Sequence, residues 1–206
     1  MIHAARLCLI AFAALFSACG PARDDTTPVE EPPPEGVYGQ APAAVGGTPS
    51  VVSLQAPFVE VEPTAAPVMD QFGLVFSPRR MVVRAGEEVT FKNSESLAHN
   101  VHVRSMEADS DVLNVDTDPG DSYVFAFEQP GGYDVFCDIH PGMTAFIYAT
   151  VASYTVIADD DGNFVFTDVP PGSYTVTVWS VDPDLVGEST VEVGVGSTKI
   201  EFPPRG

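Results

Sequence analysis

Three observations predict an all-β protein built from two β-sandwiches. From about residue 50 onward, short runs rich in Val, Phe, Tyr and Thr alternate with clusters of Gly, Pro and Asp, a spacing typical of sandwiches and barrels. After the first 20 residues, no stretch shows the apolar periodicity of a helix. Residues 64–151 and 152–206 carry different motifs, which indicates a separate sandwich for each section.

Each expected strand is a run of alternating or wholly apolar residues between turn residues. In chain order, the expected strands span residues 51–54, 72–76, 81–84, 88–92, 100–104, 122–128, 132–137, 143–151, 153–159, 163–169, 173–181, 189–195 and 198–202. Section 152–206 is short for a complete sandwich. We therefore hypothesise that residues 50–63 supply its first strand, which makes section 64–151 an insertion.

Length and charge limit the function classes. The 206 residues are enough for one large or two small domains. Nine basic against 29 acidic residues give a net charge of -20, which repels phosphate backbones and excludes nucleic acid as a partner. The same charge favours cationic partners.

The N-terminus predicts export and a lipid anchor. Residues 1–18 contain one early Arg and then an apolar run too short to span a bilayer, as in a signal peptide. The ending LFSAC resembles a bacterial lipoprotein processing site, which makes Cys19 the lipidated first residue; an ordinary cleaved signal is the alternative. Residues 19–49 are rich in Pro, Gly and Glu and predict an extended acidic tether. We expect the protein on the periplasmic or cell-surface side of a bacterial membrane.

Cys137 stands alone in the mature chain, because Cys8 lies in the signal and Cys19 in the lipid site. A lone cysteine in an exported protein has no internal disulfide partner, and a free thiol there is exposed to oxidation. A bound metal ion would protect it.

Cys137, His140 and Met143 follow one another at three-residue spacing in CDIHPGM, on a loop between two expected strands. Thiolate, imidazole and thioether together favour copper. A second imidazole must come from elsewhere. His99 is the candidate, since a register that buries His99 also buries Val101 and Val103 and turns the intervening residues Asn100, His102 and Arg104 to water.

AHNVHV and CDIHPGM together resemble the blue-copper cupredoxins, in particular the plastocyanin, amicyanin and pseudoazurin group, over about residues 70–151. The resemblance implies a Greek-key sandwich with one type 1 copper ion. His99, Cys137 and His140 would be the equatorial ligands and Met143 the weak axial ligand. Asn100 would join the two ligand segments by hydrogen bonding, and Pro141 would remove a backbone donor near the site.

The same resemblance implies a one-electron carrier rather than an enzyme, with other redox proteins as its partners. We expect the protein to be a monomer. Electrons would pass through the second histidine, His140, in an apolar patch that includes Pro141 and Gly142. Phe136 should point outward and is either a second contact area or a merely exposed ring. Zinc is the alternative metal, although structural zinc sites favour more thiolates. The three histidines of the mature chain are too few for a copper oxidase.

The second section, YTVIADDDGNFVFTDVPPGSYTVTVW, resembles the carboxypeptidase regulatory-like, transthyretin-like β-sandwich. Its acidic run, residues 159–161, lacks the spacing of a calcium loop and predicts a hairpin turn. Two other functions stay open besides electron transfer: a copper-binding or copper-sensing surface protein, and a structural surface lipoprotein.

Overall fold

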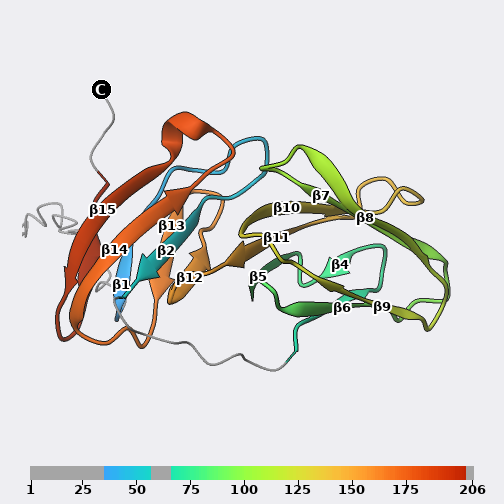
Figure 1. Cartoon of the computed structure of the whole chain (residues 1–206), viewed down its shortest axis with the longest axis horizontal. Coiled ribbons are helices and arrows are strands. Elements are labelled where there is room, and N and C mark those ends of the chain that lie inside the picture. The colour runs from blue at the N-terminus through green and yellow to red at the C-terminus, as the bar shows by residue number, and fades with distance from the viewer. Residues whose placement is uncertain (1–34, 57–65, 203–206) are drawn as a thin grey trace, which may run out of the picture. The chain divides into compact units, whose positions relative to one another are not determined.

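Nearly all regular structure in the computed structural model consists of β-strands (Figure 1). The structure describes residues 35–56 and 66–202. Within these ranges the only helical element is a single 3-10 turn, η1 (Pro183–Leu185), and no helix is long and apolar enough to span a membrane. The all-β prediction is confirmed.

The first sandwich consists of two mixed sheets formed by β3 to β11. One sheet has the strand order β5-β11-β10-β7-β8 and the other β4-β3-β6-β9. The strands are β3 (Val68–Gln71), β4 (Phe76–Ser77), β5 (Arg80–Arg84), β6 (Glu88–Asn93), β7 (His99–Ser105), β8 (Ser110–Thr117), β9 (Ser122–Ala126), β10 (Gly131–Phe136) and β11 (Thr144–Thr150).

The core of the first sandwich follows from the alternation of its strands. In the five-stranded sheet, Val103 of β7 lies opposite Val135 of β10, which lies opposite Ala145 of β11. All three are buried, and they form one apolar cluster with Met69 and Phe91 of the other sheet. Since strand residues alternate between faces, this register also decides which residues of β7 and β10 face the interior.

The second sandwich consists of β1, β2 and β12 to β16, in sheets ordered β12-β2-β14-β15 and β13-β1-β16. Strand β2, which lies within residues 50–63, pairs with β12 on one side and β14 on the other, and β1 precedes it as the first strand of this sandwich. The strands are β1 (Val37–Gln40), β2 (Val51–Gln55), β12 (Tyr154–Ile157), β13 (Asn163–Phe166), β14 (Gly172–Trp179), β15 (Gly187–Val193) and β16 (Thr198–Ile200).

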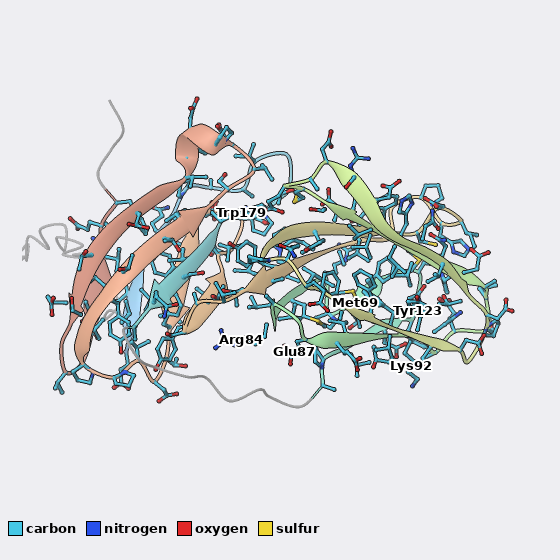
Figure 2. All side chains as sticks on the ribbon, viewed as in Figure 1. Met69, Arg84, Glu87, Lys92, Tyr123 and Trp179 are labelled. Atoms are coloured by element: carbon cyan, nitrogen blue, oxygen red, sulfur yellow. The ribbon has the colours of Figure 1, made fainter. Side chains whose placement is uncertain are left out.

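Trp179, at the end of β14, contacts the first sandwich (Figure 2). Its ring stacks on Phe146 with centroids 5.6 Å apart and meets Tyr148 edge-on at 5.3 Å. Its Nε1–H donates a hydrogen bond of 2.9 Å to Glu107, whose carboxylate also accepts from the Gly132 N–H. A Cβ at Gly132 would lie 2.5 Å from the indole ring, so glycine is required there for the indole to approach the backbone.

The predicted tether, residues 19–49, extends too far along the chain. Residues 37–40 form β1, which pairs antiparallel with β13 and parallel with β16. Val37 is fully buried in the second core, so tertiary pairing rather than local pattern makes this segment a strand. The signal (residues 1–18), Cys19 and the tether up to residue 34 lie outside the described residues.

Other strand predictions were wrong in instructive places. A strand is expected over residues 72–76, but Gly73 and Leu74 have φ of 68° and 58°, so residues 72–75 form a turn between β3 and β4, and only Phe76 lies in a strand. Strands β3 and β8 were missed. The expected hairpin at residues 159–161 is a turn, closed by an Asp159 N–H bond to Asn163 O of 3.0 Å, but β12 and β13 on its two sides belong to different sheets.

Candidate metal centre

His99 begins β7 and points into the first sandwich, with no exposed surface. Val101 and Val103 share its face and are equally buried. The alternation argument that chose His99 over His102 therefore predicted the orientation of His99 correctly. The structure differs from the expectation at Asn100, which is 3% exposed rather than turned to water. Its side chain is hydrogen-bonded to Asn114 and Asp116 of β8 and to the backbone of Asp138.

The loop that follows β10 closes on itself by backbone hydrogen bonds. The Cys137 N–H donates to Met143 O over 3.1 Å, and the Met143 N–H donates to His140 O over 3.2 Å. Gly142 has a φ of 94°, a conformation that glycine adopts without strain. The resulting tight loop places Cys137 and Met143 in the core and leaves His140 half-buried.

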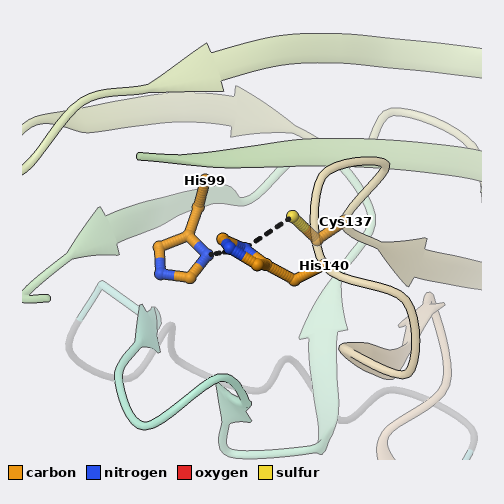
Figure 3. A group of neighbouring side chains, drawn as sticks. All are labelled: His99, Cys137 and His140. Atoms are coloured by element: carbon orange, nitrogen blue, oxygen red, sulfur yellow. Dashed lines mark hydrogen bonds between the residues drawn. The ribbon is translucent and has the colours of Figure 1, made fainter. Parts of the chain in front are cut away.

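The three ring and sulfur donors converge on one point (Figure 3). His99 Nδ1 lies 3.0 Å from His140 Nδ1, which lies 3.8 Å from Cys137 Sγ. All three donor atoms lie within 4.8 Å of one another. Metal–nitrogen and metal–sulfur bonds of about 2.0 and 2.3 Å require donors spaced about 3–4 Å apart, so the group fits a single transition-metal ion. Two imidazoles and a thiolate suit copper.

Met143 is 1% exposed and belongs to the same buried cluster as Cys137. Its backbone is bonded to both Cys137 and His140, so the thioether starts from the loop that carries two of the donors. Its role as axial ligand stays a prediction.

Asn100 connects the two ligand segments. Its side-chain oxygen accepts a hydrogen bond of 3.3 Å from the Asp138 N–H, next to Cys137. Its amide donates to Asn114 over 2.7 Å and to Asp116 over 3.3 Å, both on β8. This is the connection that the resemblance implied. Pro141, the other expected neighbour of the site, is exposed.

Glu95 is a site residue that the sequence did not suggest. Its Oε2 accepts from His99 Nε2 over 3.0 Å and from the Leu74 N–H over 3.2 Å. The Leu74 N–H is the main cause that lowers the pKa of Glu95, and His99 lowers it further. A spacing of four residues predicts a side-chain contact in a helix but not in a loop, so the sequence offered no reason to pair Glu95 with His99.

His102 lies on the opposite face of β7 and is not part of the donor group. Its ring nitrogens lie 3.0 Å from Asp138 and 3.1 Å from Asp111, and hydrogen bonding to His102 is the main cause that lowers the pKa of Asp138. The His102 ring also packs on Phe136, with centroids 4.2 Å apart. Phe136 is therefore half-buried beneath an imidazole rather than an open ring.

Apolar side chains at the surface come from the same segments as the donors. Ile139 precedes His140 and is 47% exposed, and Leu97 precedes His99 by two residues and is 46% exposed. Pro141 and Gly142 are also exposed. The half-buried His140 thus has exposed Ile139, Pro141 and Gly142 as its chain neighbours, although the same loop also exposes the carboxylate of Asp138.

Comparison with known proteins matches residues 64–152 to the family model of copper binding proteins, plastocyanin/azurin family. A plastocyanin of Scenedesmus fuscus is 35% identical over 83 residues, covering 35% of this chain and 82% of the plastocyanin. The amicyanin-alpha of Methylorubrum extorquens is 29% identical over 107 residues, covering 52% of this chain and 90% of the amicyanin.

Solved structures give a similar set of neighbours. Amicyanin from Paracoccus versutus is 24% identical, with a TM-score of 0.39 over 43% of this chain and 85% of the amicyanin. A purple cupredoxin from Nitrosopumilus maritimus is 21% identical, with a TM-score of 0.37 over 41% of this chain and 99% of the cupredoxin. Residues 143–200 match a second family model, described as polysaccharide lyase family 4, domain II.

Proposed function

Because the chain belongs to the plastocyanin/azurin family of copper-binding proteins, we propose that it holds one type 1 copper ion and carries single electrons between redox proteins. The observation that carries the proposal is the convergence of His99 Nδ1, His140 Nδ1 and Cys137 Sγ within 4.8 Å. The copper ion supplies the one-electron couple, and the residues of the chain hold its ligands in place.

His99, Cys137 and His140 would hold the ion through two imidazoles and a thiolate, and the Met143 thioether would be a fourth, weaker ligand. Thiolate and thioether favour copper over harder ions, and the site has one thiolate where structural zinc sites usually have more. The chain offers no second cysteine to this loop, so the donor set suits a mononuclear site.

Rigidity of the ligand frame supports electron transfer. His99 is fully buried between two sheets and hydrogen-bonded to Glu95 through Nε2, and the loop of Cys137 is closed by backbone hydrogen bonds. A frame that changes little on gaining an electron keeps the reorganisation energy small. His140, half-buried beside the exposed residues Ile139, Pro141 and Gly142, would be the route by which a docked partner exchanges the electron.

The cellular setting is part of the proposal. The signal-like residues 1–18 and the LFSAC ending support export, with Cys19 as a lipid anchor on the outer side of a bacterial membrane. Residues 20–34 would then join the membrane to β1. The net charge of -20 supports redox partners with a cationic docking surface.

The domain organisation that we propose is an insertion. Section 64–151 would form the first sandwich and interrupt a carboxypeptidase regulatory-like sandwich made of β1, β2 and residues 152–206. The position of β2 between β12 and β14 supports it.

Loading the purified full chain with cupric ion tests the function. We expect intense blue absorption at one copper per chain, bleached by a reductant and restored by an oxidant. Colourless protein with one bound copper would favour a binding or sensing role. Protein that binds no copper would leave only a structural role.

A further inference from the structure

Glu95 connects a metal ligand to a surface turn. Its carboxylate contacts His99 Nε2 at 3.0 Å on one side and the Leu74 N–H at 3.2 Å on the other. The Glu95 side chain is 18% exposed, against 0% for His99, so it lies between the buried ring and the solvent. Its own backbone N–H donates to Asn93 over 3.0 Å, which fixes where the side chain starts.

The contact with Glu95 decides which nitrogen of His99 is free for a metal ion. A carboxylate only accepts hydrogen bonds, so Nε2 must carry the proton. His99 Nδ1, which faces His140 Nδ1 at 3.0 Å, then keeps its lone pair for the ion. A carboxylate on the outer nitrogen also increases the basicity of a ligating imidazole.

The backbone of the turn at residues 72–74 directs the Leu74 N–H toward the Glu95 carboxylate. Gly73 and Leu74 both have positive φ, at 68° and 58°, and the Leu74 N–H points at the carboxylate. Leu74 and Phe72 expose 47% and 62% of their surface. The segment of Glu95 is also tied to β3, because the Ser94 N–H donates to the Asp70 carboxylate over 3.1 Å.

We propose that Glu95 is a positioning residue that fixes His99 as an Nδ1 ligand and connects it to the exposed 72–74 turn, so that the conformation of this turn influences the reduction potential. The inference rests on the proposed copper function. An anionic partner on the imidazole stabilises the oxidised, more highly charged ion more than the reduced one. Weakening the contact should therefore shift the equilibrium toward reduced copper.

The first test compares Glu95→Gln with Glu88→Gln in the copper-loaded full chain. Glu88 is an exposed carboxylate at the far end of β6 from Asn93, so its substitution removes the same charge without touching His99. We expect Glu95→Gln to favour the reduced state about tenfold more than wild type, which is about 59 mV for one electron, and Glu88→Gln to leave the potential nearly unchanged. Equal shifts in the two variants would overturn the proposal.

The second test uses the metal-free protein and needs no copper activity. Nitrogen NMR should show the His99 ring protonated on Nε2 in wild type and in Glu88→Gln, with slow exchange of the Leu74 N–H. Both signatures should be lost in Glu95→Ala, which removes the acceptor, whereas Glu95→Gln keeps an acceptor oxygen and should change them less. Unchanged spectra in Glu95→Ala would overturn the role of Glu95, whereas a wild-type protein that never turns blue would overturn the proposed function instead.

The turn itself is tested by Gly73→Val, with Leu74→Gly as the control. Valine is strained at a φ of 68°, so Gly73→Val should displace the Leu74 N–H and shift the potential in the same direction as Glu95→Gln. Glycine at position 74 keeps the N–H and tolerates the φ of 58°, so it should leave the potential unchanged. A Gly73→Val protein that folds and keeps the wild-type potential would overturn the connection to the turn.

Discussion

The two sandwiches differ in what they bury. The interior of the first sandwich contains three side-chain amides and one imidazole, each residue at most 3% exposed: Gln71, Asn93, Asn100 and His99. The buried polar side chains of the second sandwich are serine hydroxyls: Ser50, Ser53, Ser153 and Ser180. Its core is otherwise aliphatic and aromatic. The candidate metal centre thus lies in the sandwich whose interior holds buried amides and an imidazole.

The buried amides of the first sandwich are all hydrogen-bonded, as buried polar groups must be to avoid a large desolvation cost. Asn93 donates to Leu97 O over 2.8 Å and to Thr117 O over 2.9 Å. Gln71 donates to the Thr117 hydroxyl over 3.1 Å. The bonds of Asn93 hold the segment that leads to His99, so the polar interior helps to fix the position of this candidate ligand.

Removing the Cys137 thiolate should have the largest effect, and the two sandwiches should respond to it differently. We expect Cys137→Ala to abolish the blue absorption completely while the second sandwich stays folded, because Cys137 belongs to the first core alone. Copper titration followed by visible absorption measures the colour, and amide exchange in β2 and β14 reports on the second sandwich. Residual blue colour would contradict the assignment of Cys137 as ligand.

Trp179→Ala should uncouple the sandwiches. Losing the ring contacts with Phe146 and Tyr148 should cost about 3 kcal/mol of unfolding free energy and divide one calorimetric transition into two. Trp179→Phe is the matched control, since it keeps an aromatic ring but loses the bond to Glu107, at a cost of about 1 kcal/mol. A single transition in Trp179→Ala would show that the sandwiches are coupled elsewhere.

Met143→Leu tests the weakest ligand. The substitution conserves volume in the core, so the protein should fold and stay blue, with its oxidation equilibrium changed by about tenfold, or roughly 1.4 kcal/mol. Voltammetry measures the shift. A colourless variant with wild-type copper content would rule against axial ligation by Met143.

Tyr148→Phe should have the smallest effect, confined to alkaline pH. Burial, and then the charge of Glu107, raise the pKa of Tyr148 from 10.0 to about 12. A group whose pKa is raised on folding contributes stability that is present below its unfolded pKa and is lost as the pH rises through its folded pKa. Wild type should therefore lose stability between about pH 10 and 12, and Tyr148→Phe should lose less. Denaturant midpoints across this range measure the difference; identical losses would contradict the prediction.

The sequence named His99, Cys137 and His140, which the structure brings together, because their chemistry is local; that they bind a metal ion stays a prediction. Cys137, His140 and Met143 lie within seven residues in CDIHPGM, and simple alternation placed His99 inward. The sequence did not predict Asn100 as buried, because its cover comes from Asn114 and Asp116 on β8. The sequence did not predict strand β8, because only Leu113 and Val115 of this polar and acidic segment pack on the core, and two apolar residues are too few to show an alternating pattern.

Long-range pairing explains the other errors. VYGQ (residues 37–40) has no strand pattern and becomes β1 because β13 and β16 flank it. FGLVF (residues 72–76) has the composition of a strand but contains Gly73 and Leu74, whose positive φ values make a turn. Local composition failed wherever a partner distant in sequence decided the conformation.

The pairing of β1 has a consequence for synthesis. The first sandwich is contiguous from β3 to β11, so it can form as soon as residue 150 is available. The second sandwich cannot close until β16, at residues 198–200, meets β1 at residues 37–40. Since non-local contacts form slowly, we expect β1 to remain unpaired with β16 until residues 198–200 are available, and a chain truncated before residue 198 to retain the loop that follows β10 beside an incomplete second sandwich.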